Sequence, residues 1–237
     1  VYGLAADATN DSAVAKIYAT KQRPSFNPLI CHVPDIESAE KLAEIPPNAR
    51  DMLNIAWPGA LTIVVKARAN NGISRLAMAG LETIALRCPA HPVAAQLLRA
   101  VARPLVAPSA NRSEQLSPTT PQHVAQSLGD DVFILAAGRS ALGLESTIID
   151  FSSDQPSLLR PGALPLDQLE LWLGRKIAPA EQRNKPNAPG QMPRHYAPRA
   201  KLRLNVTQLM PNEALLAFGA APGLQRQATL YRNLSEQ

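Results

Sequence analysis

The sequence predicts an α/β domain in which helices flank a largely buried sheet, followed by a linker and a small second unit. Short apolar runs of strand length alternate with segments whose apolar residues recur at helical spacing. The chain has 237 residues, 46% of them hydrophobic, which is enough for one sizeable core. Its 22 prolines include a late cluster, and such a cluster is typical of a linker.

The elements are expected in a regular order. Asn10 or Asp11 caps a helix over residues 11–20, and the apolar run 28–33 that follows has the length of a strand. Further helices are expected over 37–45, 49–57, 91–102, 121–128 and 167–173, and further strands over 60–67, 83–88, 104–108, 132–137, 146–151 and 157–162. This alternation is what predicts the layered α/β fold.

The late part of the chain changes character. Residues 176–200 contain five prolines and show neither helical nor strand periodicity, which indicates a linker. Beyond them, residues 201–206 and 214–220 have the pattern of two strands. We therefore expect a first domain over 1–175, a linker over 176–200, and the incomplete start of a C-terminal α/β domain over 201–237, too short to hold a core of its own.

Charge and cysteine content narrow the class of protein. A formal net charge of +5 favours an anionic partner, either a phosphate-bearing small molecule or RNA. Cys31 and Cys88 are the only cysteines and both lie in apolar runs, so a disulfide framework and a C-x-x-C metal site are excluded. A reducing cytoplasm is the expected compartment. No apolar stretch approaches the roughly 20 residues of a membrane span, so no membrane association is expected.

Several common catalytic motifs are absent. Residues 138–145, GRSALGLE, have the two glycines of a Walker A loop, but Leu144 and Glu145 stand where Lys and Ser or Thr are needed. The sequence contains no G-x-G-x-x-G, no H-E-x-x-H and no G-x-S-x-G, and its four histidines are scattered. These absences argue against a P-loop, a dinucleotide-binding fold, a zinc enzyme and acyl-serine chemistry.

Polar residues recur instead at the expected strand ends. The stretches KQRPSFN (21–27) and LEST (144–147) precede strands, while APSAN (107–111) and LLRPG (158–162) follow or end them. Ligands of open α/β sheets bind in a crevice at strand ends, so these stretches could converge on one site. Arg and Lys in such a crevice would bind phosphate oxygens.

Each stretch also has an ordinary structural interpretation. Lys21 and Arg23 could be a solvated pair at a helix C-terminus, where cations are favoured. The P-S-A-N residues suit a turn, E-S-T-I suits the start of a strand, and Arg160 could lie exposed in a turn. His32 could be a core histidine with its hydrogen bonds satisfied, or a substrate contact. Taken singly, the ordinary interpretation is favoured for most of them.

Taken together, the stretches resemble a known family. VYGLAADA, KQRPSFNPLICHV, TIALRCPAHP, LVAPSAN, ESTIID and LLRPG, in this order, resemble the YrdC-like family of threonylcarbamoyl-AMP synthases. PGQMPRHYAP resembles the linker of the two-domain members of that family. The resemblance implies a YrdC-like fold, that is, a twisted open mixed sheet with flanking helices.

The resemblance also implies a reaction. L-threonine, bicarbonate or carbon dioxide, and ATP would give threonylcarbamoyl-AMP and pyrophosphate, which makes the protein an ATP-dependent nucleotidyltransferase. A downstream threonylcarbamoyl-transfer complex would then modify the adenosine beside the anticodon of tRNA. Mg²⁺ would bridge the ATP phosphates, and its protein ligands are left open.

Site residues carry over from the family motif by motif. Lys21 and Arg23 with Ser109 and Asn111 match its K-x-R and S-x-N tetrad, which implies a catalytic role for these four. The resemblance implies ATP contacts at Arg23, Asn27, Thr83, Ser109, Ser117, Arg160 and Tyr196, and threonine contacts at His32, Arg87, Ala107 and Ser146. The linker, with Tyr196, would fold over the mouth of the site and exclude water.

Two other functions fit parts of the sequence. A module that binds double-stranded RNA or tRNA without ATP turnover would suit the basic charge, although the low aromatic content, 4%, argues against single-strand recognition. A relative that handles carbamoyl-adenylate in hydrogenase maturation would be expected to carry zinc-finger and acylphosphatase regions, which this sequence does not contain.

Overall fold

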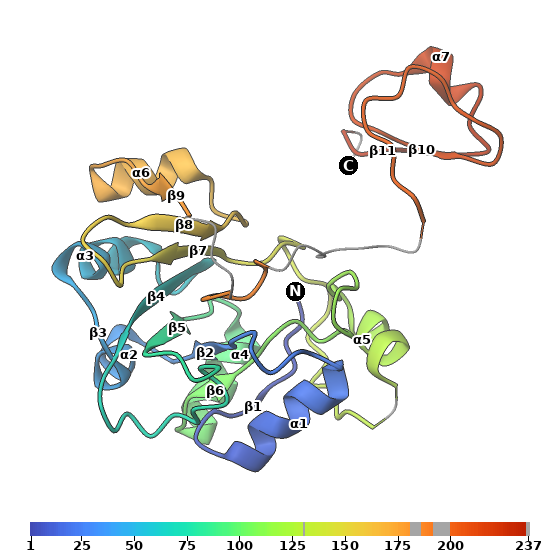
Figure 1. Ribbon diagram of the computed structural model, residues 1–237. Coiled ribbons are helices and arrows are strands. Elements are labelled where there is room, and N and C mark those ends of the chain that lie inside the picture. The colour runs from blue at the N-terminus through green and yellow to red at the C-terminus, as the bar shows by residue number, and fades with distance from the viewer. Residues whose placement is uncertain (130, 181–185, 192–199, 236–237) are drawn as a thin grey trace. The chain divides into compact units, whose positions relative to one another are not determined.

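Among the described residues, nine strands form a mixed sheet in the first of two units, Val1–Ala197 and Pro198–Gln237, of this computed structural model (Figure 1). The structure describes residues 1–129, 131–180, 186–191 and 200–235. The strands are β1 (Ala6–Asp7), β2 (Ile30–His32), β3 (Ala43–Glu44), β4 (Leu61–Ala67), β5 (Thr83–Arg87), β6 (Leu105–Val106), β7 (Thr147–Asp150), β8 (Ser157–Arg160) and β9 (Ala178–Pro179). Their order across the sheet is β1-β6-β2-β5-β4-β7-β8-β9, with β3 paired to β4.

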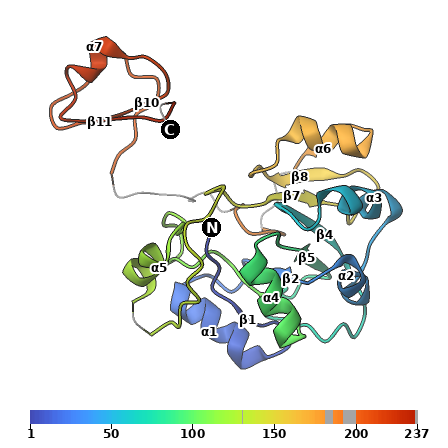
Figure 2. The same cartoon turned by 180° about the vertical axis from the view of Figure 1, so that it is seen from behind.

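Parallel and antiparallel pairs are combined in this sheet. The pairs β2–β5, β4–β7 and β8–β9 are parallel, and the other neighbours are antiparallel. Six helices flank it in the described part of the first unit: α1 (Asp11–Lys21), α2 (Ile36–Leu42), α3 (Pro47–Ala56), α4 (Pro92–Val101), α5 (Pro121–Leu128) and α6 (Leu166–Leu173). Both views place α3 and α6 beside β7 and β8, and α1 beside β1 (Figures 1 and 2). The predicted twisted open mixed sheet with flanking helices is confirmed.

Helix α1 begins and ends where its sequence requires. The Asn10 side chain accepts a hydrogen bond from the backbone N–H of Ala13 at 3.0 Å, which caps the first turn. At the other end, Gln22 takes a left-handed conformation, with φ at 51°, and the chain leaves the helix. Lys21 therefore stands in the last turn and Arg23 in the loop that leads into β2.

The two faces of the sheet differ. One face packs against α1, α2, α3 and α6 and forms the main core, to which Ile63, Leu86 and Ile149 contribute from the central strands. The other face carries a smaller apolar cluster of Ile30, Val64, Ala85, Ile148 and Ala188. The second face also carries His32, Arg87, Asp150 and Arg160, so it is the face on which a polar site can form.

Several sequence predictions about strands are wrong. Residues 132–137 form no strand, because Val132 and Ile134 pack beside α5 without a neighbouring strand to pair with. Residues 201–206 are also irregular, and Leu202 and Leu204 are exposed. Conversely, Ala178–Pro179, inside the predicted linker, pairs with β8 as β9.

The second unit is small. Its described part contains β10 (Ala214–Ala217), α7 (Pro222–Gln225) and β11 (Leu230–Asn233), and β10 pairs with β11 in parallel. Leu215 and Ala217 on β10 are buried, while Leu216 and Phe218 are exposed. In the described parts of both units, no helix combines the length and apolar character that crossing a membrane demands.

Candidate active site

A row of polar side chains crosses the face of the sheet opposite the main core. His32 on β2 is the register partner of Arg87 on β5, and Arg160 on β8 is the partner of Ile148 on β7. Register partners on neighbouring strands project to the same face, and so do residues two apart along one strand. His32, Arg87 and Arg160 therefore share the face of the smaller apolar cluster, and three separate strands bring them together.

Lys21 holds the loop that follows β6. Its side chain is buried, with 1% of its surface exposed, and Nζ donates hydrogen bonds to the carbonyls of Ser109, at 2.5 Å, and Asn111. Burial, followed by repulsion from Arg23, lowers the pKa of Lys21 to about 7. The interpretation of Lys21 as a solvated surface cation is wrong. The K-x-R and S-x-N stretches are therefore in direct contact, since the hydrogen bond from Lys21 to Asn111 joins residues that are 90 positions apart in the sequence.

Arg23 and Asn27 lie in the loop between α1 and β2. Arg23 donates from Nε to the Asn27 carbonyl at 3.3 Å and from Nη2 to the Pro28 carbonyl at 2.9 Å. The amide oxygens Oδ1 of Asn27 and Asn111 are both buried and have no hydrogen-bond partner among the described residues. Buried polar atoms are seldom left without a partner, so these two are candidate contacts for a ligand.

Most of the predicted ATP contacts line one pocket. Lys21, Arg23, Asn27, Ser109, Asn111 and Ser117 line it together with Pro24, Ser113, Glu114, Gln115 and Gly190. Arg160 lies directly behind Gly190, because a Cβ placed on that glycine would come within 2.4 Å of Arg160 Cδ. The structure thus brings together every predicted tetrad residue and three further predicted ATP contacts, Asn27, Ser117 and Arg160.

Buried cations gather in the pocket and on the face of the sheet beside it. Burial is the main cause that lowers the pKa of Arg23 to about 10; Tyr18 opposes this shift, and the nearby Arg160 guanidinium adds to it. The pKa of Arg87 is also lowered to about 10, first by burial and then by Arg160. No carboxylate among the described residues forms an ion pair with Lys21, Arg23 or Arg87. Buried cations without counter-ions repel one another, so this arrangement favours a ligand with several negative charges.

The predicted threonine contacts lie beside this cluster. Arg87 donates from Nε to the Gly59 carbonyl at 3.0 Å, which leaves the end of its guanidinium for a carboxylate. Burial, followed by the charge of Arg87, lowers the pKa of His32 to about 3, so its imidazole is neutral at neutral pH. His32 Nδ1 is buried without a hydrogen-bond partner in the described part of the chain, so His32 is not the core histidine with satisfied hydrogen bonds.

Ser146 and Ala107 stand at the edges of this group. Ser146 is buried, and its hydroxyl lies 2.7 Å from that of Thr62. Arg160 donates to the Ser146 carbonyl at 2.7 Å from Nη2 and at 3.2 Å from Nε, so Arg160 is buried rather than exposed in a turn. Ala107 is half-buried at the end of β6, where its N–H donates to the Ile30 carbonyl at 3.1 Å.

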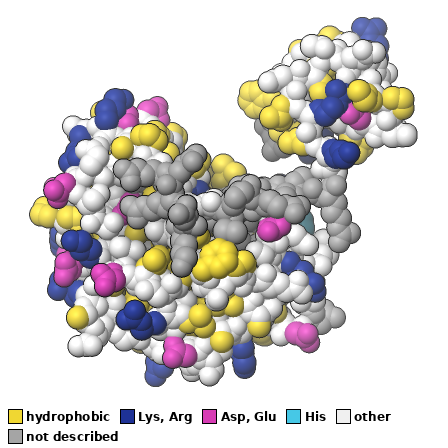
Figure 3. Space-filling view, in the orientation of Figure 1, with side chains coloured by type: hydrophobic (Ala, Val, Ile, Leu, Met, Phe, Trp, Pro, Cys, Tyr) yellow, Lys and Arg dark blue, Asp and Glu magenta, His cyan; other side chains and the backbone are white. Residues whose placement is uncertain are grey.

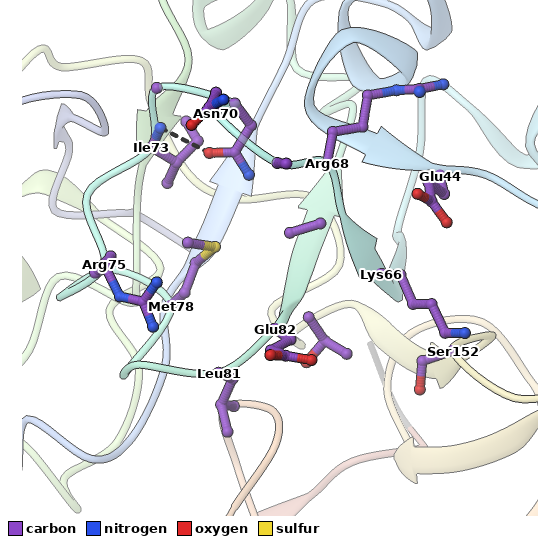
Figure 4. A pocket seen from close by; sticks show the side chains of 15 residues that line it. Glu44, Lys66, Arg68, Asn70, Ile73, Arg75, Met78, Leu81, Glu82 and Ser152 are labelled. Atoms are coloured by element: carbon purple, nitrogen blue, oxygen red, sulfur yellow. Dashed lines mark hydrogen bonds between the residues drawn. The ribbon is translucent and has the colours of Figure 1, made fainter.

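Thr83 is not brought to this group. Thr83 is the first residue of the five-residue strand β5, and Arg87 is the last. Thr83 pairs with Lys66, near the end of β4. There it lines a separate hollow of about 600 Å³, whose lining includes Lys66, Arg75, Met78 and Glu82 (Figure 4). The hollow is the larger of the two, but it contains none of the other predicted site residues. The assignment of Thr83 to ATP stays a prediction that the geometry does not support.

Other residues of the site were missed or cannot be placed. Tyr196 lies outside the described residues. Sequence reasoning missed Thr62 and Glu145, which accepts a hydrogen bond from the Ser117 hydroxyl. Residues 186–191 belong to the predicted linker, and Ala188 among them packs against the apolar cluster on the polar face.

The acidic residues near the pocket are few. Within the described ranges, no group of three or more His, Cys, Asp or Glu side chains is placed to hold a metal ion. Mg²⁺ bound mainly through phosphates and water needs only one or two carboxylates. Glu114 lines the pocket, and Glu145 contacts Ser117 on its wall. A Mg²⁺ ion that arrives with a nucleotide would find these two carboxylates at or beside the pocket.

Two family models match the chain. A Sua5/YciO/YrdC model, described as "Telomere recombination", matches residues 1–162, and one described as "Threonylcarbamoyl-AMP synthase, C-terminal domain" matches residues 164–233. Threonylcarbamoyl-AMP synthases of Bacillus subtilis and Pyrococcus abyssi are 43% and 42% identical to it over 86% and 85% of its length. These alignments cover 60% and 61% of the relatives, so the chain spans about three fifths of the length of the curated relatives it matches.

Solved structures show the same similarity. The crystal structure of Pyrococcus abyssi Sua5 complexed with L-threonine is 34% identical to this chain, with a TM-score of 0.85, and the match covers 100% of this chain and 74% of that one. Escherichia coli YciO is 20% identical with a TM-score of 0.61, over 70% of this chain and 81% of that one, and this likeness concerns the fold alone.

Proposed function

The chain belongs to the family of Sua5, YciO and YrdC proteins, and on that premise we propose that it makes threonylcarbamoyl-AMP and pyrophosphate from L-threonine, bicarbonate or carbon dioxide, and ATP. The observation that carries the proposal is the pocket of Lys21, Arg23, Asn27, Ser109 and Asn111, with Arg160 behind it. Among the described residues, no carboxylate forms an ion pair with Lys21 or Arg23 in this pocket. A bound triphosphate would supply the missing negative charge.

The site divides between the two substrates. Arg23 and Arg160 would bind phosphate oxygens of ATP, and the orphaned amide oxygens of Asn27 and Asn111 would accept hydrogen bonds from it. Lys21 would act at one remove, by fixing the carbonyls of Ser109 and Asn111. Arg87 would pair with the threonine carboxylate, and the neutral imidazole of His32 beside it would take a hydrogen bond from the same substrate. The Pyrococcus abyssi relative is known as a complex with L-threonine, which supports this half of the assignment.

The reaction needs no side-chain nucleophile. The threonine amine adds through its nitrogen lone pair to the carbon of carbon dioxide and loses a proton, which gives a carbamate. A carbamate oxygen then forms a bond to the α-phosphorus of ATP while the bond to the pyrophosphate oxygen breaks. Such a transfer depends on positioning and charge stabilisation, which the buried cations of the pocket provide. When bound, Mg²⁺ would neutralise further phosphate charge near Glu114 and Glu145.

The finer assignments follow from this proposal. We place the protein among ATP-dependent nucleotidyltransferases and assign catalysis to residues 1–175, with 176–200 as the linker and 201–237 as part of a C-terminal domain. Its product is a mixed anhydride that a downstream threonylcarbamoyl-transfer complex would use to modify tRNA. The cytoplasm, where tRNA and ATP are both available, is the compartment that fits.

The proposal is tested by product formation. The chain is mixed with ATP, Mg²⁺, bicarbonate and L-threonine, and pyrophosphate and threonylcarbamoyl-AMP are measured while each substrate is left out in turn. We expect both products only when threonine and bicarbonate are present together, since the carbamate is the attacking group. Pyrophosphate release that ignores threonine would contradict the proposal.

The RNA-binding alternative has less support. Figure 3 shows basic side chains interspersed with acidic ones on this face of the described first unit, where a continuous basic surface would be expected for binding an RNA duplex. Salt-dependent binding of double-stranded RNA by a chain that forms no adenylate would favour this alternative.

A further inference from the structure

We infer that Asp150 is a positioning residue, which fixes residues 186–191 on the polar face of the sheet so that this segment holds Arg160 at the pocket. The expected effect of this anchor on ATP binding rests on the function proposed above. Asp150 ends β7 and is buried, with 3% of its surface exposed. It pairs in register with Val64, so its carboxylate lies on the same face as Arg160, but it does not line the pocket.

The carboxylate of Asp150 anchors the segment directly. Asn187 donates from Nδ2 to Asp150 Oδ2 at 3.0 Å, and the backbone N–H of Ser152 donates to Oδ1 at 2.8 Å. The bond to Asn187 is buried, and hydrogen bonds to ionised acceptors are about twice as strong as neutral ones. Asp150 thus joins the end of β7 to a segment that lies 37 residues further along the chain.

The segment is rigid enough to transmit this anchoring. Gln191 Oε1 accepts hydrogen bonds from the backbone N–H groups of Asn187, at 2.9 Å, and Ala188, at 3.1 Å. The Ala188 side chain is fully buried against the apolar cluster that contains Val64 and Ile148. Residues 187–191 therefore form a closed turn seated on the sheet, and displacement of Asn187 would displace the whole turn.

The far end of this turn meets Arg160. The Pro189 carbonyl accepts a hydrogen bond from Arg160 Nη1 at 3.4 Å. Gly190 has a φ of +92°, and a Cβ at that position would lie 2.4 Å from Arg160 Cδ and 3.4 Å from Nη1. Gly190 also lines the pocket beside Arg23. The turn therefore forms one wall around the Arg160 guanidinium. If the turn were displaced, the Arg160 side chain could move, although the proposed reaction needs this cation in a fixed place.

A charge swap tests the anchor. Asn187→Asp places a second carboxylate against that of Asp150, and the repulsion is expected to release the turn. We expect faster hydrogen exchange at the backbone amides of residues 187 and 188, and an ATP dissociation constant raised about tenfold, which corresponds to about 1.4 kcal/mol. Adding Asp150→Asn restores an amide–carboxylate pair with the roles reversed, and both effects should be largely reversed.

Controls separate the anchor from general damage. Asn54→Asp adds the same charge at an exposed position of α3 and should change neither measurement. Asn187→Ala removes the donor without adding charge, and it replaces Asn187→Asp if that variant does not fold. A double variant no better than the single one would overturn the anchor, and faster exchange with unchanged ATP affinity would overturn the link to Arg160. If the wild-type chain itself does not bind ATP, the proposed function fails, while the exchange data still decide the anchor.

Discussion

Replacing Arg23 with alanine is expected to lower kcat/KM for ATP by about 100- to 1000-fold, the range typical of removing one preorganised donor that stabilises developing charge. Arg23 lines the pocket, and its guanidinium is held by the carbonyls of Asn27 and Pro28. It is therefore already oriented before ATP binds. The change is measured by steady-state pyrophosphate release at saturating threonine and bicarbonate.

Two further variants show what the loss means. Arg23→Lys keeps the charge but not the planar fork, and we expect it to recover only part of the activity. Arg75→Ala removes an exposed arginine from the larger hollow at the other end of the sheet and should leave kcat/KM unchanged. If Arg75→Ala were as harmful as Arg23→Ala, or if Arg23→Ala were harmless, ATP would not bind where we place it.

Replacing Gly162 with alanine is expected to destabilise the first unit by about 3 kcal/mol, at the upper end of the usual range for overpacking. Its Cβ would lie 2.5 Å from the Ser146 carbonyl carbon, 2.5 Å from the Thr147 nitrogen and 2.6 Å from the Glu145 oxygen. All three are backbone atoms and cannot rotate away. The chain must therefore separate where Ser146 holds Arg160, so activity should fall together with stability.

Thermal unfolding measures this effect. For a domain of this size, about 3 kcal/mol lowers the melting temperature by roughly 6–12 °C. Gly223→Ala, in the second unit, is the control for a glycine-to-alanine change without a clash, because a Cβ there meets nothing within 4 Å, and it should leave the melting temperature of the first unit unchanged. An unchanged melting temperature for Gly162→Ala would show that β7 and the residues after β8 are not packed as the structure has them.

The elements predicted best are those with local signals. The helix behind Asn10 and the strand Leu61–Ala67 are recognisable from a cap and from an uninterrupted apolar run, and both form. Residues 132–137 have an equally apolar pattern but no neighbouring strand, since pairing depends on the rest of the fold. The two-residue strand Ala178–Pro179 exists only because β8 offers it an edge, which no local pattern reveals.

The candidate site shows the same division. The sequence could suggest that Lys21 and Asn111 belong together only through the family resemblance, because their contact joins the end of α1 to the loop after β6. The anchor between Asp150 and Asn187 has no sequence signal of its own. The distance of Thr83 from the pocket, by contrast, could have been inferred, since the two ends of a five-residue strand lie about 13 Å apart.

The central claim is that ATP and threonine bind on the polar face of the sheet, between Arg23 and Arg87. Hydrogen exchange of the whole chain, with and without Mg·ATP and L-threonine, tests it most directly. The account predicts that ligands slow exchange at residues 23–32, 109–117 and 146–160 and leave residues 66–83, around the larger hollow, unchanged. Slower exchange confined to residues 66–83 would contradict the account, because it would place the substrates at the opposite end of β5.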